Sequence, residues 1–101
     1  MSGDGQTIRH VLVRGRVQGI GFRAFVEHEA FKRGLEGWVR NRRDGTVEAL
    51  FAGPPDIVAD IVVACRRGPP GARVDALYER EGTTDELKLA FGATFAVLPT
   101  A

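Results

Sequence analysis

The sequence predicts an α+β fold of the ferredoxin-like, split βαβ type, with two helices on one face of a mostly antiparallel sheet. Three observations support this prediction. Strand-like and helix-like segments alternate in the order β-α-β-β-α-β, and one further short strand is expected near the C-terminus. Asp44-Gly45 separates two β-prone segments, which is typical of a hairpin. Hydrophobic residues make up 44% of the 101 residues, which is enough for one packed core.

The first half of the chain predicts a strand, a helix and the hairpin. Residues 8–13 (IRHVLV) are rich in β-prone residues and end at a glycine cluster, so we expect a strand. Apolar residues between Phe22 and Lys32 recur at helical spacing, and Gly34 is placed to end that helix. The hairpin strands are expected within residues 35–41 (LEGWVRN) and 46–52 (TVEALFA).

The second half predicts another helix and the remaining strands. Residues 54–56 (PPD) suit a helix start, and residues 66–68 (RRG) suit its end. Apolar and polar residues alternate in residues 72–81 (ARVDALYERE), which indicates a strand. Residues 82–90 fit neither pattern, and residues 94–98 (TFAVL) are expected to form the last short strand.

Composition limits the possible functions. A single cysteine, Cys65, excludes an internal disulfide and a cysteine-cluster metal site, and His10 and His28 lack metal-ligand spacing. The net charge of +1 does not favour nucleic-acid binding. Because we find neither a bilayer-spanning apolar stretch nor a signal-peptide pattern, we expect a cytoplasmic protein without a membrane partner. Polar residues 1–7 are expected to be a flexible N-terminus before one domain, residues 8–101.

The stretch RGRVQGIGFR, residues 14–23, lies between the first strand and the first helix. Its glycines permit positive φ angles, so successive N–H groups can converge on an anion. Neither the Walker ending nor the spacing G-x-G-x-x-G is present, which disfavours ATP and NAD. The positive charge of Arg23 in the first helical turn is unfavourable with the helix dipole and costs about 0.3–1 kcal/mol of helix stability. A phosphate bound in the loop would make the charge of Arg23 favourable. From this stretch alone, a basic surface turn and an anion cradle are both possible.

Two separate motifs resemble those of the acylphosphatase family. VRGRVQGIGFR is similar to the glycine loop of that family, with Ile20 where valine is usual. GWVRNRRDGTVEALFAG, residues 37–53, resembles its second signature, and residues 68–74 (GPPGARV) resemble its helix-to-strand junction. The similarity extends from about Val11 to Tyr78. Two motifs at compatible spacing are far more specific than a lone glycine loop.

The resemblance implies a hydrolase that cleaves the carboxyl-phosphate bond of small acyl phosphates, without a metal, another cofactor or a covalent intermediate. It implies that Arg23 binds the phosphate and that Asn41 positions the attacking water. Backbone amides of the loop would share the phosphate: Arg16, Val17, Gln18, Gly19, Ile20, Gly21 and Phe22. A monomer is the default expectation for so small a domain.

Two other functions are compatible with a fold of this type. A non-catalytic ligand- or RNA-binding module of the same fold would expose sheet aromatics in a characteristic motif, and Trp38 and Phe51 stand alone. The second alternative is a domain of a larger enzyme that handles carbamoyl phosphate. The short chain favours an independent protein instead.

The remaining candidate residues are expected to be structural. His10 has no visible acid or nucleophile partner, and Cys65 falls on an apolar helix stripe. Trp38 is expected in the core, and Glu27 and Glu29 on a solvated helix face. Without the second motif, Asn41 would be taken as part of the approach to the hairpin turn.

Overall fold

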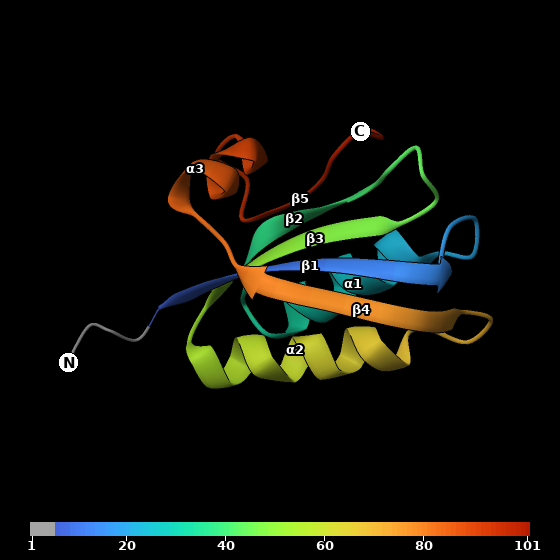
Figure 1. The fold of residues 1–101 in the computed structure, drawn as a ribbon. Coiled ribbons are helices and arrows are strands. Elements are labelled where there is room, and N and C mark those ends of the chain that lie inside the picture. Colours follow the sequence, from blue (N-terminus) through green and yellow to red (C-terminus); the bar gives the residue numbers. More distant parts are fainter. Residues whose placement is uncertain (1–5) are drawn as a thin grey trace.

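The computed structural model describes residues 6–101, and it confirms the predicted fold class (Figure 1). Residues 1–5 of the predicted flexible N-terminus lie outside the described residues, while Thr7 already begins the first strand. The elements are β1 (Thr7–Arg16), α1 (Phe22–Lys32), β2 (Glu36–Asn41), β3 (Val47–Gly53), α2 (Pro55–Arg67), β4 (Arg73–Glu81), α3 (Thr84–Leu87), the 3-10 turn η1 (Lys88–Ala90) and β5 (Phe95–Val97).

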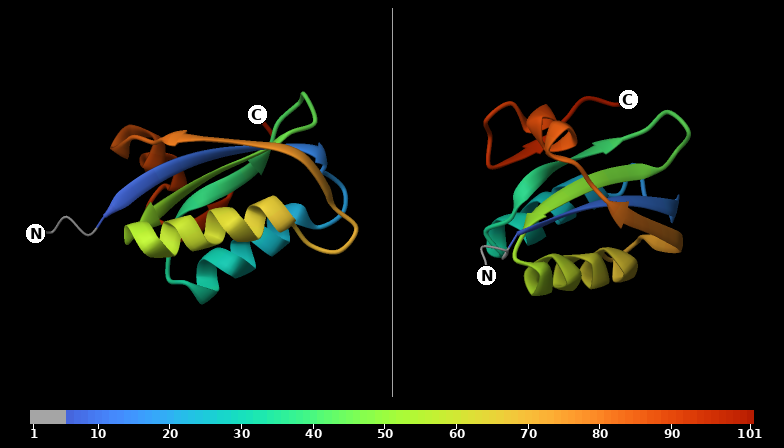
Figure 2. Two further views of the ribbon diagram at one scale, coloured as in Figure 1. Left: turned by 60° about the horizontal axis from the view of Figure 1, so that its bottom comes forward. Right: turned by 60° about the vertical axis from the view of Figure 1, so that its left-hand side comes forward.

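The five strands form one sheet in the order β4-β1-β3-β2-β5. All neighbours are antiparallel except β2 and β5, which run parallel. Helices α1 and α2 cover one face of this sheet, as two views show (Figure 2). No helix within the described part of the chain is long and apolar enough to cross a bilayer.

The sheet register brings two distant segments to the same level. Val13 of β1 and Asn41 of β2 both pair with Val47, on opposite sides of β3. Since β1 and β2 both run antiparallel to β3, they point the same way. The end of β2 therefore lies near the loop that follows β1.

The first strand is longer than predicted. We expected it to end at the glycine cluster, but β1 continues through Gly15 to Arg16 because β4 pairs with its last residues. Gly15 has a φ of 135° at a register shift, and a Cβ atom there would collide with the carbonyl oxygen of Arg73. Glycine is needed at this position so that β4 can approach closely.

Within the ambiguous residues 82–90, residues 84–90 form α3 and η1, which pack on the face of the sheet opposite α1 and α2. Trp38, 1% exposed, lies beneath them with Leu50, and its indole N–H donates to the carbonyl oxygen of Glu86 at 2.8 Å. Thr83 and Glu86 form a capping box at the start of α3. A four-residue helix is too short to show a hydrophobic period, and this box was the available sequence signal.

Candidate active site

The loop between β1 and α1 has a backbone suited to an anion. Gly19 and Gly21 have φ angles of 76° and 85°, a region in which other residues are strained. Gly21 is the N-cap of α1, where no side chain caps the helix and no acidic residue occupies the first turn. The first N–H groups of α1 therefore have no acceptor from a capping side chain. Together with the helix dipole, this arrangement favours a negative charge at the loop.

The loop is fixed at two points. Val17 is 1% exposed and packs in the main core, which anchors the start of the loop. The side-chain amide of Gln18 donates to the carbonyl oxygens of Arg42 and Thr46, at 2.8 and 2.7 Å. Both carbonyls belong to the β2–β3 hairpin that follows Asn41. The loop and the hairpin are therefore connected directly.

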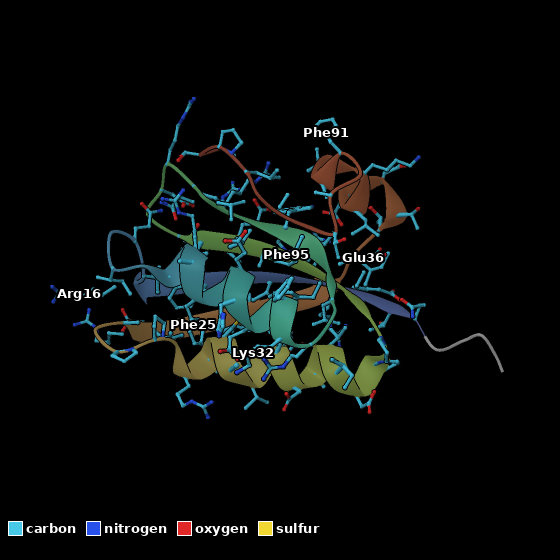
Figure 3. The ribbon with its side chains drawn as sticks, turned by 180° about the vertical axis from the view of Figure 1, so that it is seen from behind. Arg16, Phe25, Lys32, Glu36, Phe91 and Phe95 are labelled. Atoms are coloured by element: carbon cyan, nitrogen blue, oxygen red, sulfur yellow. The ribbon has the colours of Figure 1, made fainter. Side chains whose placement is uncertain are left out.

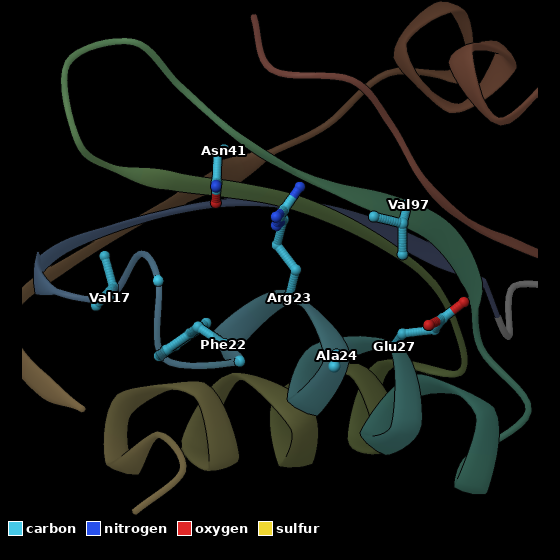
Figure 4. A pocket seen from close by; sticks show the side chains of 9 residues that line it. Val17, Phe22, Arg23, Ala24, Glu27, Asn41 and Val97 are labelled. Atoms are coloured by element: carbon cyan, nitrogen blue, oxygen red, sulfur yellow. The ribbon is translucent and has the colours of Figure 1, made fainter. Parts of the chain in front are cut away.

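A pocket of about 310 Å³ lies where the loop, α1, β2 and β5 meet (Figure 4). It is lined by Val17, Gly19, Gly21, Phe22, Arg23, Ala24, Glu27, Asn41 and Val97. Six of the nine predicted site residues are thus brought together. Arg16, Gln18 and Ile20 do not line it: Arg16 pairs with Arg73 in the sheet, Gln18 reaches the hairpin, and Ile20 packs against the core.

Arg23 differs from the other arginines in its surroundings. It is half-buried, and within residues 6–101 no carboxylate forms an ion pair with it. The other half-buried arginines each pair with at least one carboxylate: Arg9, Arg33, Arg40 and Arg42. Figure 4 shows the Arg23 side chain rising from α1 toward the sheet, between Asn41 and Val97. Its guanidinium is available to an anionic ligand in the pocket.

Asn41 presents a buried hydrogen-bond acceptor on the same side of the sheet. Its Oδ1 atom is buried and accepts no hydrogen bond from the residues that the structure describes. Its main-chain carbonyl accepts from the N–H of Ala101 at 3.0 Å, which fixes the backbone at the end of β2. Most buried side-chain polar atoms in proteins have a partner, so an unsatisfied amide oxygen beside a pocket indicates a ligand-binding position.

His10 does have an acidic partner, contrary to the prediction. Its Nε2 atom lies 2.7 Å from Oε2 of Glu48, and Oε1 of the same carboxylate accepts a hydrogen bond from Arg40 at 2.7 Å. Burial raises the pKa of Glu48, but the hydrogen bonds from His10 and Arg40 outweigh it and hold the pKa below its usual value. This cluster is on the face of the sheet away from the pocket, because Arg40 and Asn41 are adjacent strand residues.

The other structural predictions are mixed. Cys65 is buried in the core as expected, and burial raises the pKa of its thiol to about 12. Glu29 pairs with Lys32 and Arg33. Glu27 is exposed, as expected for a solvated face, but it also lines the pocket. Its place four residues after Arg23, one helical turn away, was the signal for it.

Comparison with known proteins assigns the chain to a class of α+β hydrolases, whose solved structures have the same fold. The sequence profile of the acylphosphatase family matches residues 9–93. The chain belongs to the acylphosphatase family. It is 61% identical over 94 residues to an acylphosphatase of Rhodopseudomonas palustris, covering 92% of this chain and 95% of that one.

Solved structures agree with this assignment. The acylphosphatase of Bacillus subtilis is 40% identical and superimposes with a TM-score of 0.79, covering 90% of this chain and 97% of that one. An acylphosphatase of Coxiella burnetii is 31% identical, with a TM-score of 0.84 and coverage of 97% and 100%. The ferredoxin-like fold and the predicted membership of the family are thereby confirmed, and with them the prediction of an acylphosphatase enzyme.

Proposed function

We propose that this chain hydrolyses small acyl phosphates to a carboxylate and inorganic phosphate, by direct attack of water and without a metal ion. One observation carries the proposal: Arg23 and Asn41 line one pocket at the uncapped N-terminus of α1. The name of the relatives supports acyl phosphates as the substrate class. In residues 6–101, no group of three or more His, Cys, Asp or Glu side chains is arranged to hold a metal.

In this proposal the phosphate lies in the glycine loop. Backbone N–H groups of residues 17–22 surround its oxygens, and the predicted contribution of the Arg16 amide would come from the last residue of β1. Arg23 neutralises the phosphate charge through paired N–H bonds, which its planar guanidinium can direct at two oxygens. The absence of a carboxylate partner for Arg23 within the described residues supports this role.

Asn41 positions the water. Its buried Oδ1 accepts a hydrogen bond from the water, which directs the water oxygen toward phosphorus. The new bond joins that oxygen to phosphorus while the bond from phosphorus to the acyl oxygen breaks. The electron pair leaves with the carboxylate, one proton of the water passes to a phosphate oxygen, and the other proton stays on the attacking oxygen. No side chain acts as a base in this scheme.

The chemistry is compatible with so few groups. The leaving carboxylate has a conjugate acid with a pKa of about 4, so it departs without strong protonation. A loose transition state for phosphoryl transfer needs mainly orientation and stabilisation of charge on the phosphoryl oxygens. The loop and Arg23 provide the charge stabilisation, and Asn41 provides the orientation.

The RNA-binding alternative has less support. Trp38 and Phe51 are at most 1% exposed, so neither offers a face on which a base could stack. We further propose that the protein works as a single-domain, cytoplasmic monomer, since residues of the loop, α1, β2 and β5 of one chain are sufficient to form the pocket. Light scattering coupled to gel filtration tests the oligomeric state.

The decisive experiment measures phosphate release from acetyl phosphate and benzoyl phosphate, with and without EDTA. We expect activity that survives EDTA, and dependence on a metal would refute the mechanism. Arg23→Ala should lower kcat/KM at least about 100-fold, and Asn41→Ala should lower kcat about 100-fold while inorganic phosphate still inhibits. Arg67→Ala removes an exposed arginine outside the pocket and should leave the kinetics unchanged.

A further inference from the structure

Helix α1 carries one row of side chains that begins at the proposed phosphate site. Arg23, Glu27 and Phe31 are spaced four residues apart, so they lie on the same side of the helix, about 6 Å apart along its axis. Glu27 lines the pocket that contains Arg23 and Asn41. It also lines a neighbouring hollow of about 320 Å³, together with Phe31 and Phe95. The two hollows therefore meet at Glu27.

Strand β5 forms the opposite wall. Val97 is 42% exposed and faces Arg23 and Glu27 across the first pocket (Figure 4). Phe95 is half-buried, lies beside α1, and stacks on Phe51 with ring centroids 6.0 Å apart (Figure 3). Phe31 is 81% exposed at the far end of the row. We call this space, between Arg23, Glu27 and Phe31 on one side and Phe95 and Val97 on the other, the α1–β5 groove.

We infer that the α1–β5 groove is the subsite for the acyl group, and that it favours apolar, uncharged acyl groups over those with a second carboxylate. This inference rests on the proposed function. With the phosphate at Arg23, an acyl group that follows the groove runs along α1 toward Glu27. Its apolar part then contacts Val97, and a larger ring reaches Phe31, so water leaves apolar surface on both sides.

Glu27 gives the groove its charge selectivity. Its side chain is exposed and forms no ion pair with any residue of the described range 6–101. A second carboxylate on the acyl group would come close to this uncompensated charge and be repelled. Because the groove is open to solvent, salt screens this repulsion. A neutral aryl or alkyl group meets no such penalty.

The apolar part of the inference is tested with two substrates. The ratio of kcat/KM for benzoyl phosphate to that for acetyl phosphate should fall about three- to tenfold in Phe31→Ala and in Val97→Ala. Matched controls remove similar surface elsewhere. Phe91→Ala replaces a phenyl group that is 85% exposed, and Val63→Ala a valine on α2 that is 58% exposed, both outside the groove. These controls should leave the ratio unchanged.

The charge part is tested with succinyl phosphate, whose acyl group ends in a carboxylate. In Glu27→Gln, its kcat/KM relative to acetyl phosphate should rise severalfold at low ionic strength, and the gain should shrink at about 1 M salt. Glu81→Gln is the matched control, because Glu81 is exposed on β4 at the opposite edge of the sheet.

Two outcomes separate the subsite from the proposed function. If the wild-type chain hydrolyses no acyl phosphate, the proposed function fails, and the subsite with it. If acetyl phosphate is hydrolysed but both substrate ratios are unchanged in the groove variants, the subsite alone is refuted. Inhibition by inorganic phosphate should stay unchanged in Phe31→Ala, since phosphate has no acyl group and Phe31 does not line the pocket that contains Arg23.

Discussion

The side-chain amide of Gln18 donates a 2.7 Å hydrogen bond to the main-chain carbonyl of Thr46 and a second bond to that of Arg42. The first residue belongs to the glycine loop, and the two acceptors belong to the hairpin after Asn41. The contact fixes the distance between the loop and the strand end. In the proposed mechanism this is the distance between the phosphate and the water that attacks it.

Gln18→Ala should therefore impair turnover more than folding. The substitution leaves two carbonyls without their donor and releases the loop, so we expect kcat/KM for acetyl phosphate to fall about tenfold or more. The free energy of unfolding should fall by about 1–3 kcal/mol. Gln6→Ala, which changes an exposed glutamine before β1, is the control. An unchanged kcat/KM in Gln18→Ala would show that the contact does not position the loop.

Arg23→Lys should not restore the function of Arg23. Lysine keeps the positive charge but lacks the planar fork that binds two phosphate oxygens at once. We expect kcat/KM at least about tenfold below the wild type, with weaker inhibition by inorganic phosphate. Near-normal kinetics in Arg23→Lys would mean that only the charge matters.

The Glu48 cluster predicts a loss of stability in acid. The pKa of Glu48 is lowered in the folded state. The stability that the ionised Glu48 carboxylate contributes is therefore present above the unfolded pKa of about 4.5, and it is lost as the pH falls through the folded pKa. Glu48→Gln should lower the free energy of unfolding by about 2 kcal/mol or more at pH 7, because Arg40 loses its partner. Urea unfolding should show this difference shrinking below pH 4.5.

The same titration has a control in Glu36→Gln. Glu36 is exposed and has no ion pair within the described chain, so the substitution should change stability little at either pH. A Glu48→Gln deficit that stays constant from pH 7 to pH 3 would contradict the role assigned to the Glu48 carboxylate.

Cys65 should be unreactive in the native protein. The thiol is buried in the core and its pKa is raised to about 12, so little thiolate forms at pH 8. We expect no labelling by a thiol reagent at pH 8 until the chain is unfolded in urea, when one equivalent should react. Rapid labelling without denaturant would show that α2 opens locally.

The elements that depend on local pattern could be predicted from the sequence. Helix α1 begins at Phe22 and ends at Lys32 as expected, because its apolar spacing and the glycines beside it are local signals. The partner of His10 could not be predicted, since it depends on the register between β1 and β3. The end of β1 was wrong for the same reason: Arg16 belongs to the strand through its pairing with β4.

In the candidate site too, residues in local motifs could be predicted, and residues that depend on long-range pairing could not. Arg23 and Asn41 came from motifs, and both line one pocket, while their roles stay predictions. The side-chain contacts of Gln18 could not be foreseen, because its partners are main-chain carbonyls 24 and 28 residues away. The place of Val97 in the pocket could not be predicted, because it depends on the parallel pairing of β5 with β2.

The shared pairing of Val13 and Asn41 with Val47 has a consequence for folding. The glycine loop and Asn41 meet only when β3 lies between β1 and β2, so no local segment of the chain can contain the complete site. Helices form faster than such long-range strand pairs. During refolding, hydrolysis should therefore recover later than the helical circular dichroism signal, and enzymatic activity would report the assembly of the central strands.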